Sequence, residues 1–193
     1  MAKLYFRYGA MNCGKTTNLL QVAHNYEEKG LKVIIIKSSI DKKGDKNIVS
    51  RLGVERKVDI LLEPNEKIKN LINLDNLNCI LVDEAQFLEP SQVKELWMIA
   101  KLNSIPVICY GLRTNFKGEF FKGSKTLMEL SDVLEELVTI CKCGHKAKFN
   151  VRLINGKIVN TGSEVAIDGF DNVTYESMCG KCYIENVIKR GIK

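Results

Sequence analysis

The chain has 193 residues, of which 45% are hydrophobic and 27% charged. These values lie close to the average for soluble globular domains, so they exclude an intrinsically disordered tail and a membrane protein. The length suits one ordinary domain, or one domain with a small appendage. Because no apolar run approaches a membrane span, and residues 1–9 (MAKLYFRYG) enter a strand pattern instead of a signal-peptide stretch, we expect a cytoplasmic location.

The charge balance is basic, with 29 Lys and Arg residues against 23 Asp and Glu residues. Such a balance can indicate nucleic acid, an anionic membrane or a phosphate-bearing ligand. Apart from a moderate cluster within residues 42–57, the basic residues are scattered, so we expect a solvated surface and no nucleic-acid or membrane partner. The chain also has seven cysteines, which without an export signal favour metal ligands or buried thiols over disulfides.

Short apolar runs alternate with amphipathic stretches along the first part of the chain. The runs are rich in β-branched residues and have the length of strands buried on both faces. Strands that alternate with helices predict a parallel, doubly wound sheet. The expected strands are residues 4–8, 31–36, 79–82 and 105–110, and the expected helices are residues 15–29 and 90–102.

The alternation ends near residue 140. Residues 126–137 predict one more helix, with apolar residues spaced to cover a sheet face, and residues 138–140 predict a last strand of the sheet. Turn signals such as Asn155-Gly156 and Asp168-Gly169 then indicate hairpins and long loops. The expected domains are residues 1–140, an α/β core, and residues 141–193, a smaller unit.

Residues 9–16 (GAMNCGKT) fit the phosphate-loop pattern G-x-x-x-x-G-K-[ST], between an expected strand and an expected helix. The glycines allow a tight turn in which backbone N–H groups point at phosphate oxygens. Lys15 supplies a positive charge, and Thr16 offers its hydroxyl to Mg²⁺. The pattern predicts ATP binding by Gly9, Ala10, Met11, Asn12, Cys13, Gly14, Lys15, Thr16 and Thr17.

An acidic pair follows the apolar run of residues 79–82. We expect Asp83, at the end of the strand, to hold Mg²⁺ through its water shell. Because successive residues point opposite ways, Glu84 can face the substrate and accept a proton from an attacking hydroxyl. In an ATPase the same glutamate would orient water, so the pair alone leaves both activities open. The nucleotide-associated segment is Asp83, Glu84, Ala85 and Gln86.

Two closely spaced cysteine pairs flank residues 144–178. A CxC and a CxxC together offer four thiolates, which is the pattern of a structural zinc site with no open position for catalysis. The metal would tie the ends of the intervening loop together. The expected ligands are Cys141, Cys143, Cys179 and Cys182, with His145 as an alternative to one of them, whereas Cys13, Cys79 and Cys109 are expected to serve packing.

In this order and spacing the motifs resemble the thymidine kinase family, which includes bacterial, poxviral and vertebrate cytosolic enzymes. The resemblance covers essentially the whole chain. It implies a RecA-like P-loop core with a parallel sheet, a small C-terminal zinc-binding lasso domain and a homotetramer. It rests on the phosphate loop, LKVIIIKSSID (31–41), VDEAQF (82–87), YGLRTNFKGEFF (110–121), the paired cysteines and YESMC (175–179).

The resemblance also implies roles for single residues. Glu84 corresponds to the catalytic base that takes the proton of the nucleoside 5′-hydroxyl, and Asp83 to the magnesium-associated carboxylate. A lasso loop covers the nucleoside and reads the base largely through main-chain hydrogen bonds. From the residues alone, Phe87, Leu112 and Phe116 could equally be core residues. The implied substrate contacts are Met11, Asp41, Phe87, Leu112, Phe116, Val165, Ala166, Ile167 and Tyr175.

Two departures from the family pattern stand out. Where the family usually has Asp-x-Arg, this chain has Asp41-Lys42-Lys43, which replaces a guanidinium fork by a point charge. The lasso segment before Tyr175 is longer than usual, and Asp168 stands where a glycine is common.

The implied activity is transfer of the ATP γ-phosphoryl group to the 5′-hydroxyl of thymidine, and of deoxyuridine, with Mg²⁺ and structural Zn²⁺. It would supply a nucleotide for DNA synthesis by salvage. Two alternatives stay open from the residues alone. One is a P-loop ATPase whose zinc module binds nucleic acid or a partner protein; the other is a kinase for another nucleoside or a nucleoside monophosphate.

Overall fold

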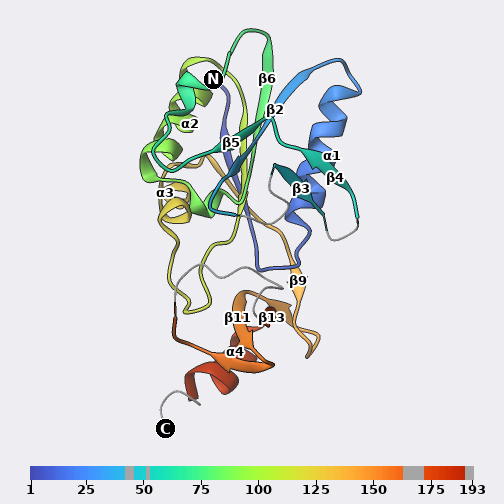
Figure 1. The fold of residues 1–193 in the computed structure, drawn as a ribbon, viewed down its shortest axis with the longest axis vertical. Helices are drawn as coiled ribbons and strands as arrows, with labels where there is room; N and C mark the ends of the chain where they lie inside the picture. Colours follow the sequence, from blue (N-terminus) through green and yellow to red (C-terminus); the bar gives the residue numbers. More distant parts are fainter. Residues whose placement is uncertain (42–45, 51–52, 163–171, 190–193) are drawn as a thin grey trace.

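The computed structural model describes residues 1–41, 46–50, 53–162 and 172–189. Its centre is a six-stranded sheet in the order β5-β2-β6-β7-β1-β8 (Figure 1). Every neighbouring pair in this sheet is parallel, which confirms the expected α/β class. The strands are β1 (Leu4–Tyr8), β2 (Lys32–Ser38), β5 (Ile60–Leu62), β6 (Leu77–Asp83), β7 (Val107–Gly111) and β8 (Val133–Glu136).

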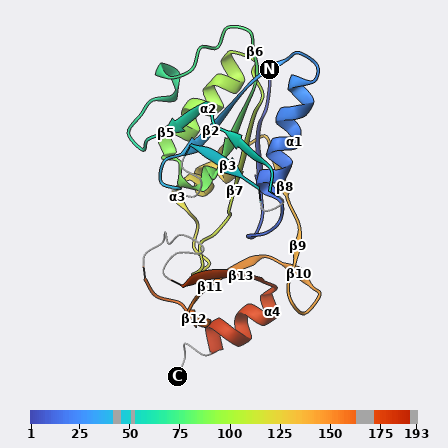
Figure 2. The ribbon, with the colours of Figure 1, turned by 45° about the vertical axis from the view of Figure 1, so that its right-hand side comes forward.

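Helices cover both faces of the sheet. Helix α1 (Lys15–Glu27) lies on one face, and α2 (Pro90–Leu102) and α3 (Lys122–Leu130) lie on the other (Figures 1 and 2). Successive strand residues point to opposite faces, so Ile36 packs toward α2 and α3 while Ile35 packs toward α1. Both faces are therefore apolar, which explains why the strands have nearly continuous runs of Val, Ile and Leu.

The elements after residue 138 lie beyond the carboxyl ends of the parallel strands (Figures 1 and 2). Their central strand is β11, which pairs with β12 and β13 in an antiparallel sheet. Asn155 and Gly156, both with positive φ, form the expected turn between β11 and β12, whereas Asp168-Gly169 lies outside the described residues. These elements are β9 (Thr139–Ile140), β10 (Lys146–Ala147), β11 (Phe149–Ile154), β12 (Lys157–Val159), β13 (Val173–Met178), α4 (Gly180–Tyr183) and the π-helix η3 (Ile184–Ile188).

Short elements fill the connections of the core. The chain between β2 and β6 forms a small antiparallel hairpin and the edge strand β5, none of which the sequence patterns indicated. The hairpin and the short helices are β3 (Asn47–Val49), β4 (Glu55–Lys57), η1 (Ile68–Asn70) and η2 (Ala85–Phe87).

The prediction of a helix over residues 126–137 is wrong. Helix α3 ends at Leu130, and the chain then adds β8 to the sheet beside β1. Ser131 is extended, with ψ 136°, and Asp132 fixes the chain to β1 because its N–H donates to the Leu4 carbonyl and its carboxylate accepts the Leu4 N–H. These contacts join residues far apart in sequence, which helical spacing cannot reveal. The expected last strand of the sheet is also wrong, since β9 pairs with β10 instead.

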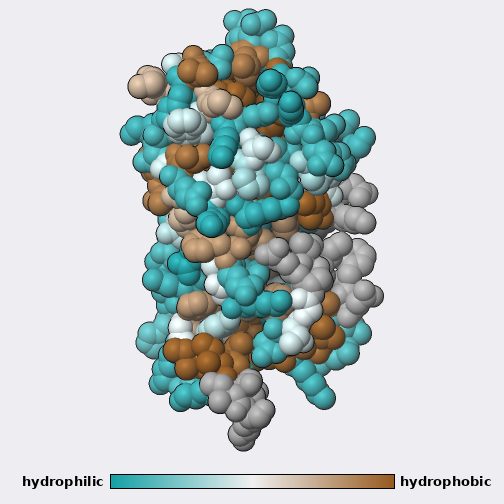
Figure 3. Space-filling view, turned by 90° about the vertical axis from the view of Figure 1, so that its left-hand side faces the viewer, coloured by the Kyte–Doolittle hydropathy of each residue, from teal (hydrophilic) through white to brown (hydrophobic). Residues whose placement is uncertain are grey.

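The face that carries α2 and α3 has hydrophobic groups interspersed with polar ones over the core (Figure 3). Toward the C-terminal elements, hydrophobic groups gather more densely. In the described parts of the chain, no helix has the length and apolar character that crossing a membrane requires.

Candidate functional site

The phosphate loop connects the end of β1 to the start of α1. A Cβ on Gly9 would lie 2.5 Å from both Cys13 Sγ and the Leu137 carbonyl oxygen, so only glycine fits there. Asn12 and Gly14 adopt the left-handed conformation, with φ of 65° and 78°. The loop therefore wraps tightly, and the first turn of α1, which has no side-chain cap, keeps its N–H groups for an anion.

Lys15 folds back over this loop. Its side chain is buried, and its Nζ donates to the Ala10 carbonyl at 3.0 Å and lies 3.6 Å from Cys13 Sγ. The ammonium is thus held above the backbone that would surround a phosphate, where it can turn toward phosphate oxygens. Of the other predicted loop residues, Ala10 is buried, Met11, Cys13, Thr16 and Thr17 are half-buried, and Asn12 and Gly14 are exposed.

Asp83 ends β6 next to the start of α1. The Thr16 hydroxyl donates to Asp83 Oδ2 at 3.4 Å, so the structure brings together the two predicted magnesium residues. A hydroxyl and a carboxylate are hard oxygen ligands, which fits Mg²⁺. Burial raises the pKa of Asp83, and the neighbouring Glu84 charge raises it further. The raised pKa means that ionising the buried carboxyl costs free energy. A divalent cation would offset this free-energy cost by stabilising the ionised carboxylate.

Glu84 adopts an unusual backbone conformation. Its φ is 50°, in the left-handed region that non-glycine residues rarely occupy and that is often found at functional sites. Gln86 Nε2 donates to Glu84 Oε2 at 2.5 Å, and Gln86 Oε1 accepts the Leu112 N–H at 3.0 Å. Gln86 and its neighbour Ala85 are buried. The two hydrogen bonds of Gln86 link the acidic turn, residues 83–87, to the segment after β7.

Charged and polar groups from three segments surround Glu84: the phosphate loop, the end of β2 and the turn after β6. Burial and the Asp41 charge raise the pKa of Glu84, whereas Lys15, the Gln86 hydrogen bond and Lys37 oppose this rise. The site therefore brings Lys15 and Asp41 within electrostatic reach of the acidic pair.

Lys37, at the end of β2, is a site residue that the sequence analysis missed. Its side chain is only 1% exposed, and its Nζ lies 3.2 Å from Asp41 Oδ2. The sequence does contain a signal for Lys37. This residue directly follows the three isoleucines of β2, at a position where a buried strand ordinarily has an apolar residue. Lys43 lies outside the described residues.

Three predicted substrate contacts lie near the ends of two neighbouring strands: Phe87 on the turn after β6, and Leu112 and Phe116 on the segment after β7. Phe87 is half-buried and meets Phe121 edge to face, with ring centroids 5.6 Å apart. Phe116 is buried, and Leu112 is half-buried with its carbonyl accepting the Ser124 hydroxyl at 2.5 Å.

Gly123 allows α3 to lie directly against the acidic turn. A Cβ there would be 2.6–2.8 Å from the main-chain carbonyl oxygens of residues 85, 86 and 88. No real side chain tolerates such distances to backbone atoms, so this approach requires glycine.

Tyr175, on β13, is half-buried beside a second residue that the sequence analysis missed, Arg152. Arg152 Nε donates to the Tyr175 hydroxyl at 2.8 Å, and its guanidinium carbon lies 3.8 Å from the centroid of the Phe116 ring. Such a contact is a close cation–π interaction, which connects the strand of Tyr175 to the segment after β7. The other predicted lasso contacts, Val165, Ala166 and Ile167, lie outside the described residues.

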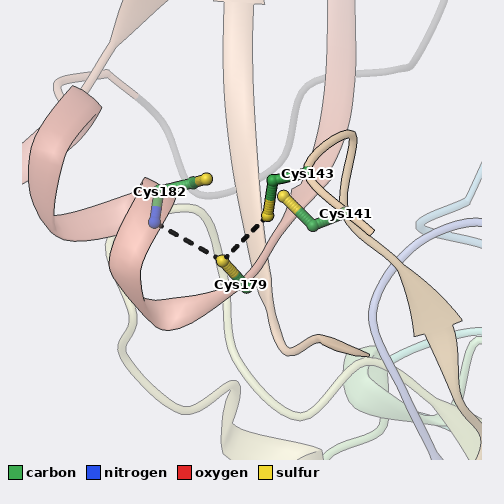
Figure 4. Close-up of side chains that lie close together, drawn as sticks. All are labelled: Cys141, Cys143, Cys179 and Cys182. Atoms are coloured by element: carbon green, nitrogen blue, oxygen red, sulfur yellow. Dashed lines mark hydrogen bonds between the residues drawn. The ribbon is translucent and has the colours of Figure 1, made fainter. Parts of the chain in front are cut away.

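The four predicted zinc ligands lie together (Figure 4). The sulfur atoms of Cys141, Cys143, Cys179 and Cys182 are all within 4.8 Å of one another, and those of Cys143 and Cys179 are 3.5 Å apart. Tetrahedral zinc with Zn–S bonds of about 2.3 Å separates its sulfurs by roughly 3.8 Å, so the cluster fits the ion. Backbone N–H groups, that of Cys143 first, lower the pKa of Cys141 to about 6, whereas hydrogen bonds with the other three cysteines raise the pKa of Cys182, so the four thiols differ in their tendency to ionise.

A parallel α/β sheet, a glycine-rich phosphate loop and strand-end carboxylates together define a P-loop nucleotide-binding protein, here with a four-cysteine module. The family model for thymidine kinase matches residues 2–183. The chain belongs to the thymidine kinase family, and its membership confirms the resemblance seen in the sequence.

Similar proteins named thymidine kinase occur in several bacteria. The one from Shewanella oneidensis is 45% identical over 190 residues, which cover 96% of this chain and 98% of that protein. The one from Francisella tularensis subsp. holarctica is 42% identical, over 97% of this chain and 99% of that protein. The one from Mannheimia succiniciproducens is 45% identical, over 93% of each. A solved structure, the Pif1 helicase from Candida albicans, is 13% identical with a TM-score of 0.39, over 71% of this chain and 36% of that chain.

Proposed function

We propose that the chain transfers the γ-phosphoryl group of ATP to the 5′-hydroxyl of thymidine, and of deoxyuridine. The observation that carries this proposal is the acidic pair Asp83 and Glu84, which lies within the electrostatic reach of Lys15 of the phosphate loop. Membership of the thymidine kinase family supports the choice of nucleoside.

The proposed mechanism assigns a role to each group. Loop N–H groups and Lys15 hold the phosphates of ATP. Thr16 and Asp83 would hold Mg²⁺, which would supply positive charge against the phosphates. Glu84 accepts the proton of the 5′-hydroxyl as its oxygen bonds to the γ-phosphorus. The bond from the γ-phosphorus to the β–γ bridging oxygen breaks, so ADP leaves and thymidine monophosphate forms.

We assign nucleoside contacts to residues around this pair. For Phe87, Leu112, Phe116 and Tyr175 the support is their position on segments that Gln86 and Arg152 link to one another, and the remaining contacts rest on the family resemblance. Exclusion of water would favour transfer to the nucleoside over hydrolysis. The proposed contacts are Met11, Asp41, Phe87, Leu112, Phe116 and Tyr175, together with Val165, Ala166 and Ile167 of the lasso.

We further divide the chain into an ATP-binding core, residues 1–140, and a zinc-binding lasso domain, residues 141–193. A separate apolar cluster within residues 141–187 supports this division. The four cysteines would hold structural Zn²⁺, which closes both ends of the lasso. We propose a homotetramer from the family resemblance, and a cytoplasmic location from the sequence pattern.

Purified protein with labelled ATP and a panel of deoxynucleosides tests the proposal. We expect labelled monophosphate from thymidine and deoxyuridine, and no product when the nucleoside is omitted. The absence of product from every pyrimidine nucleoside would refute it. ATP hydrolysis unaffected by thymidine, together with salt-sensitive binding to DNA or RNA, would instead identify the P-loop ATPase.

A further inference from the structure

Met11 lies in the middle of the phosphate loop. Both of its main-chain polar groups are hydrogen-bonded to side chains of the C-terminal module, which comprises the elements from β9 to η3. The Met11 N–H donates to Asn150 Oδ1 at 2.7 Å. The Met11 carbonyl oxygen accepts the Ser177 hydroxyl at 2.5 Å. Asn150 lies on β11 and Ser177 on β13, and the two residues are direct partners in the antiparallel pairing of these strands. One rung of this small sheet thus holds one residue of the loop.

Asn150 has a second contact that extends this link. Its side chain is buried, and its Nδ2 donates to the Thr114 carbonyl at 3.3 Å. A single amide therefore joins the phosphate loop, the segment after β7 and the C-terminal module. A buried amide that uses both of its polar atoms is a costly group to replace.

The backbone of the loop needs such support. It has two residues in the left-handed region, Asn12 and Gly14, and such conformations persist only where their surroundings hold them. Because the Met11 N–H already donates to Asn150, phosphate binding would fall to the N–H groups of the following residues. Fixing Met11 at both ends orders the loop before ATP arrives, which lowers the entropy lost on binding.

We propose that Asn150 and Ser177 act as a positioning pair, the Met11 clamp, that preorganises the phosphate loop for ATP. The inference rests on the proposed ATP site, and it goes beyond it by giving the nucleoside-covering module a part in ATP affinity. Coupling between two sites is reciprocal, so a bound phosphate chain also holds Asn150 and Ser177, and through them β11 and β13, in place.

A matched pair of variants tests the clamp. Ser177→Thr keeps the hydroxyl, whereas Ser177→Val replaces it with a methyl group of the same shape. We expect ATP affinity, measured by calorimetric titration without nucleoside, to fall about 5- to 10-fold in S177V and to stay within about 2-fold in S177T. In turnover assays the KM for ATP should rise by the same factor in S177V. The kcat at saturating ATP should stay within about 2-fold, because bound ATP itself orders the loop.

Two further variants complete the test. Asn150→Leu removes the other half of the clamp and should weaken ATP binding at least as much as S177V. Glu176→Gln breaks the neighbouring Lys142–Glu176 ion pair, whose atoms are 2.5 Å apart, without touching Met11, and should leave ATP affinity unchanged. Zinc content and the thermal midpoint of each variant identify any loss of the fold, so that a weakened variant counts only when both match those of S177T.

Equal ATP affinity in zinc-loaded S177V and S177T would overturn the clamp, whatever the nucleoside assay gives. A weaker S177V in a protein that phosphorylates no nucleoside would retain the clamp and refute the proposed function alone.

Discussion

The core and the C-terminal module are stabilised in different ways. In the core, a parallel sheet buries apolar side chains on both faces beneath three helices. In the module, the apolar cluster is small and includes two of the cysteines, while Asn150 and Arg152 are buried polar residues. The core is therefore an ordinary hydrophobic fold, whereas the module has a four-cysteine cluster that fits a metal ion and makes polar contacts with the core. We therefore expect substitutions in the core and in the module to alter different measured quantities.

The largest expected effect concerns chemistry in the core. Glu84→Gln keeps the shape of the side chain but removes the base, so kcat should fall by a factor of about 10² to 10⁴. Thymidine affinity and zinc content should stay close to those of the parent protein, because the module is untouched. Steady-state kinetics, with thymidine titration and metal analysis as controls, provide the measurement. A loss of thymidine binding with little change in kcat would show that Glu84 is not the base.

The next largest effect is expected in the module, from loss of a zinc ligand. Cys182→Ser removes one of four clustered ligands, and we expect zinc to be lost and thymidine affinity to fall by about 100-fold. ATP affinity should fall less, by about 10-fold, through loss of the clamp contacts. The matched control is Cys109→Ala, which removes a buried thiol of the core and should leave one zinc per chain. Unchanged thymidine affinity in zinc-free C182S would contradict this prediction.

A smaller effect is expected at the junction of the two regions. Arg152→Lys loses the planar group that lies over Phe116 and the Nε–H bonded to Tyr175, so the KM for thymidine should rise about 10-fold. Tyr175→Phe loses only the hydroxyl that accepts this bond and should raise it about 3-fold. Both variants should keep the KM for ATP of the parent protein. The prediction fails if the two KM values rise together.

The smallest effect is a pH dependence of stability in the core. Burial raises the pKa of Asp83 to about 7, above its value in the unfolded chain, so the fold favours the neutral carboxyl. Its contribution to stability is fully present below the unfolded pKa of about 4 and is lost as the pH rises through the folded value. We expect urea unfolding of magnesium-free protein with its zinc retained to show a smaller loss of stability from pH 5 to pH 8 in Asp83→Asn than in the parent. Parallel pH curves would contradict this expectation.

Regular, local signals predicted most of the core. The phosphate loop, α2 and the strand before Asp83 follow from motifs and periodicity within a few residues. The helix predicted over residues 126–137 failed because its end depends on the contact of Asp132 with Leu4, across 128 positions of sequence. Helical spacing of the apolar residues was satisfied by chance, and it could not indicate that β1 would accept another strand.

The module was less predictable for a physical reason. In β11 the apolar residues alternate with Asn150 and Arg152, which ordinarily indicates one buried and one solvated face. Both polar residues are nevertheless buried, because this second face packs against the loops at the ends of the parallel strands. The clustering of the four cysteines was predictable from the sequence, because a CxC and a CxxC are spacings typical of metal ligands.

Gly123 has a consequence for where turnover can be tuned. Because α3 rests on the carbonyl oxygens of the turn that begins after Glu84, a movement of the helix toward this turn would displace the turn. A substitution on the outer side of α3 that tilts the helix would then act as a lever on the proposed base. The reaction rate could thus respond to surface residues that touch neither substrate.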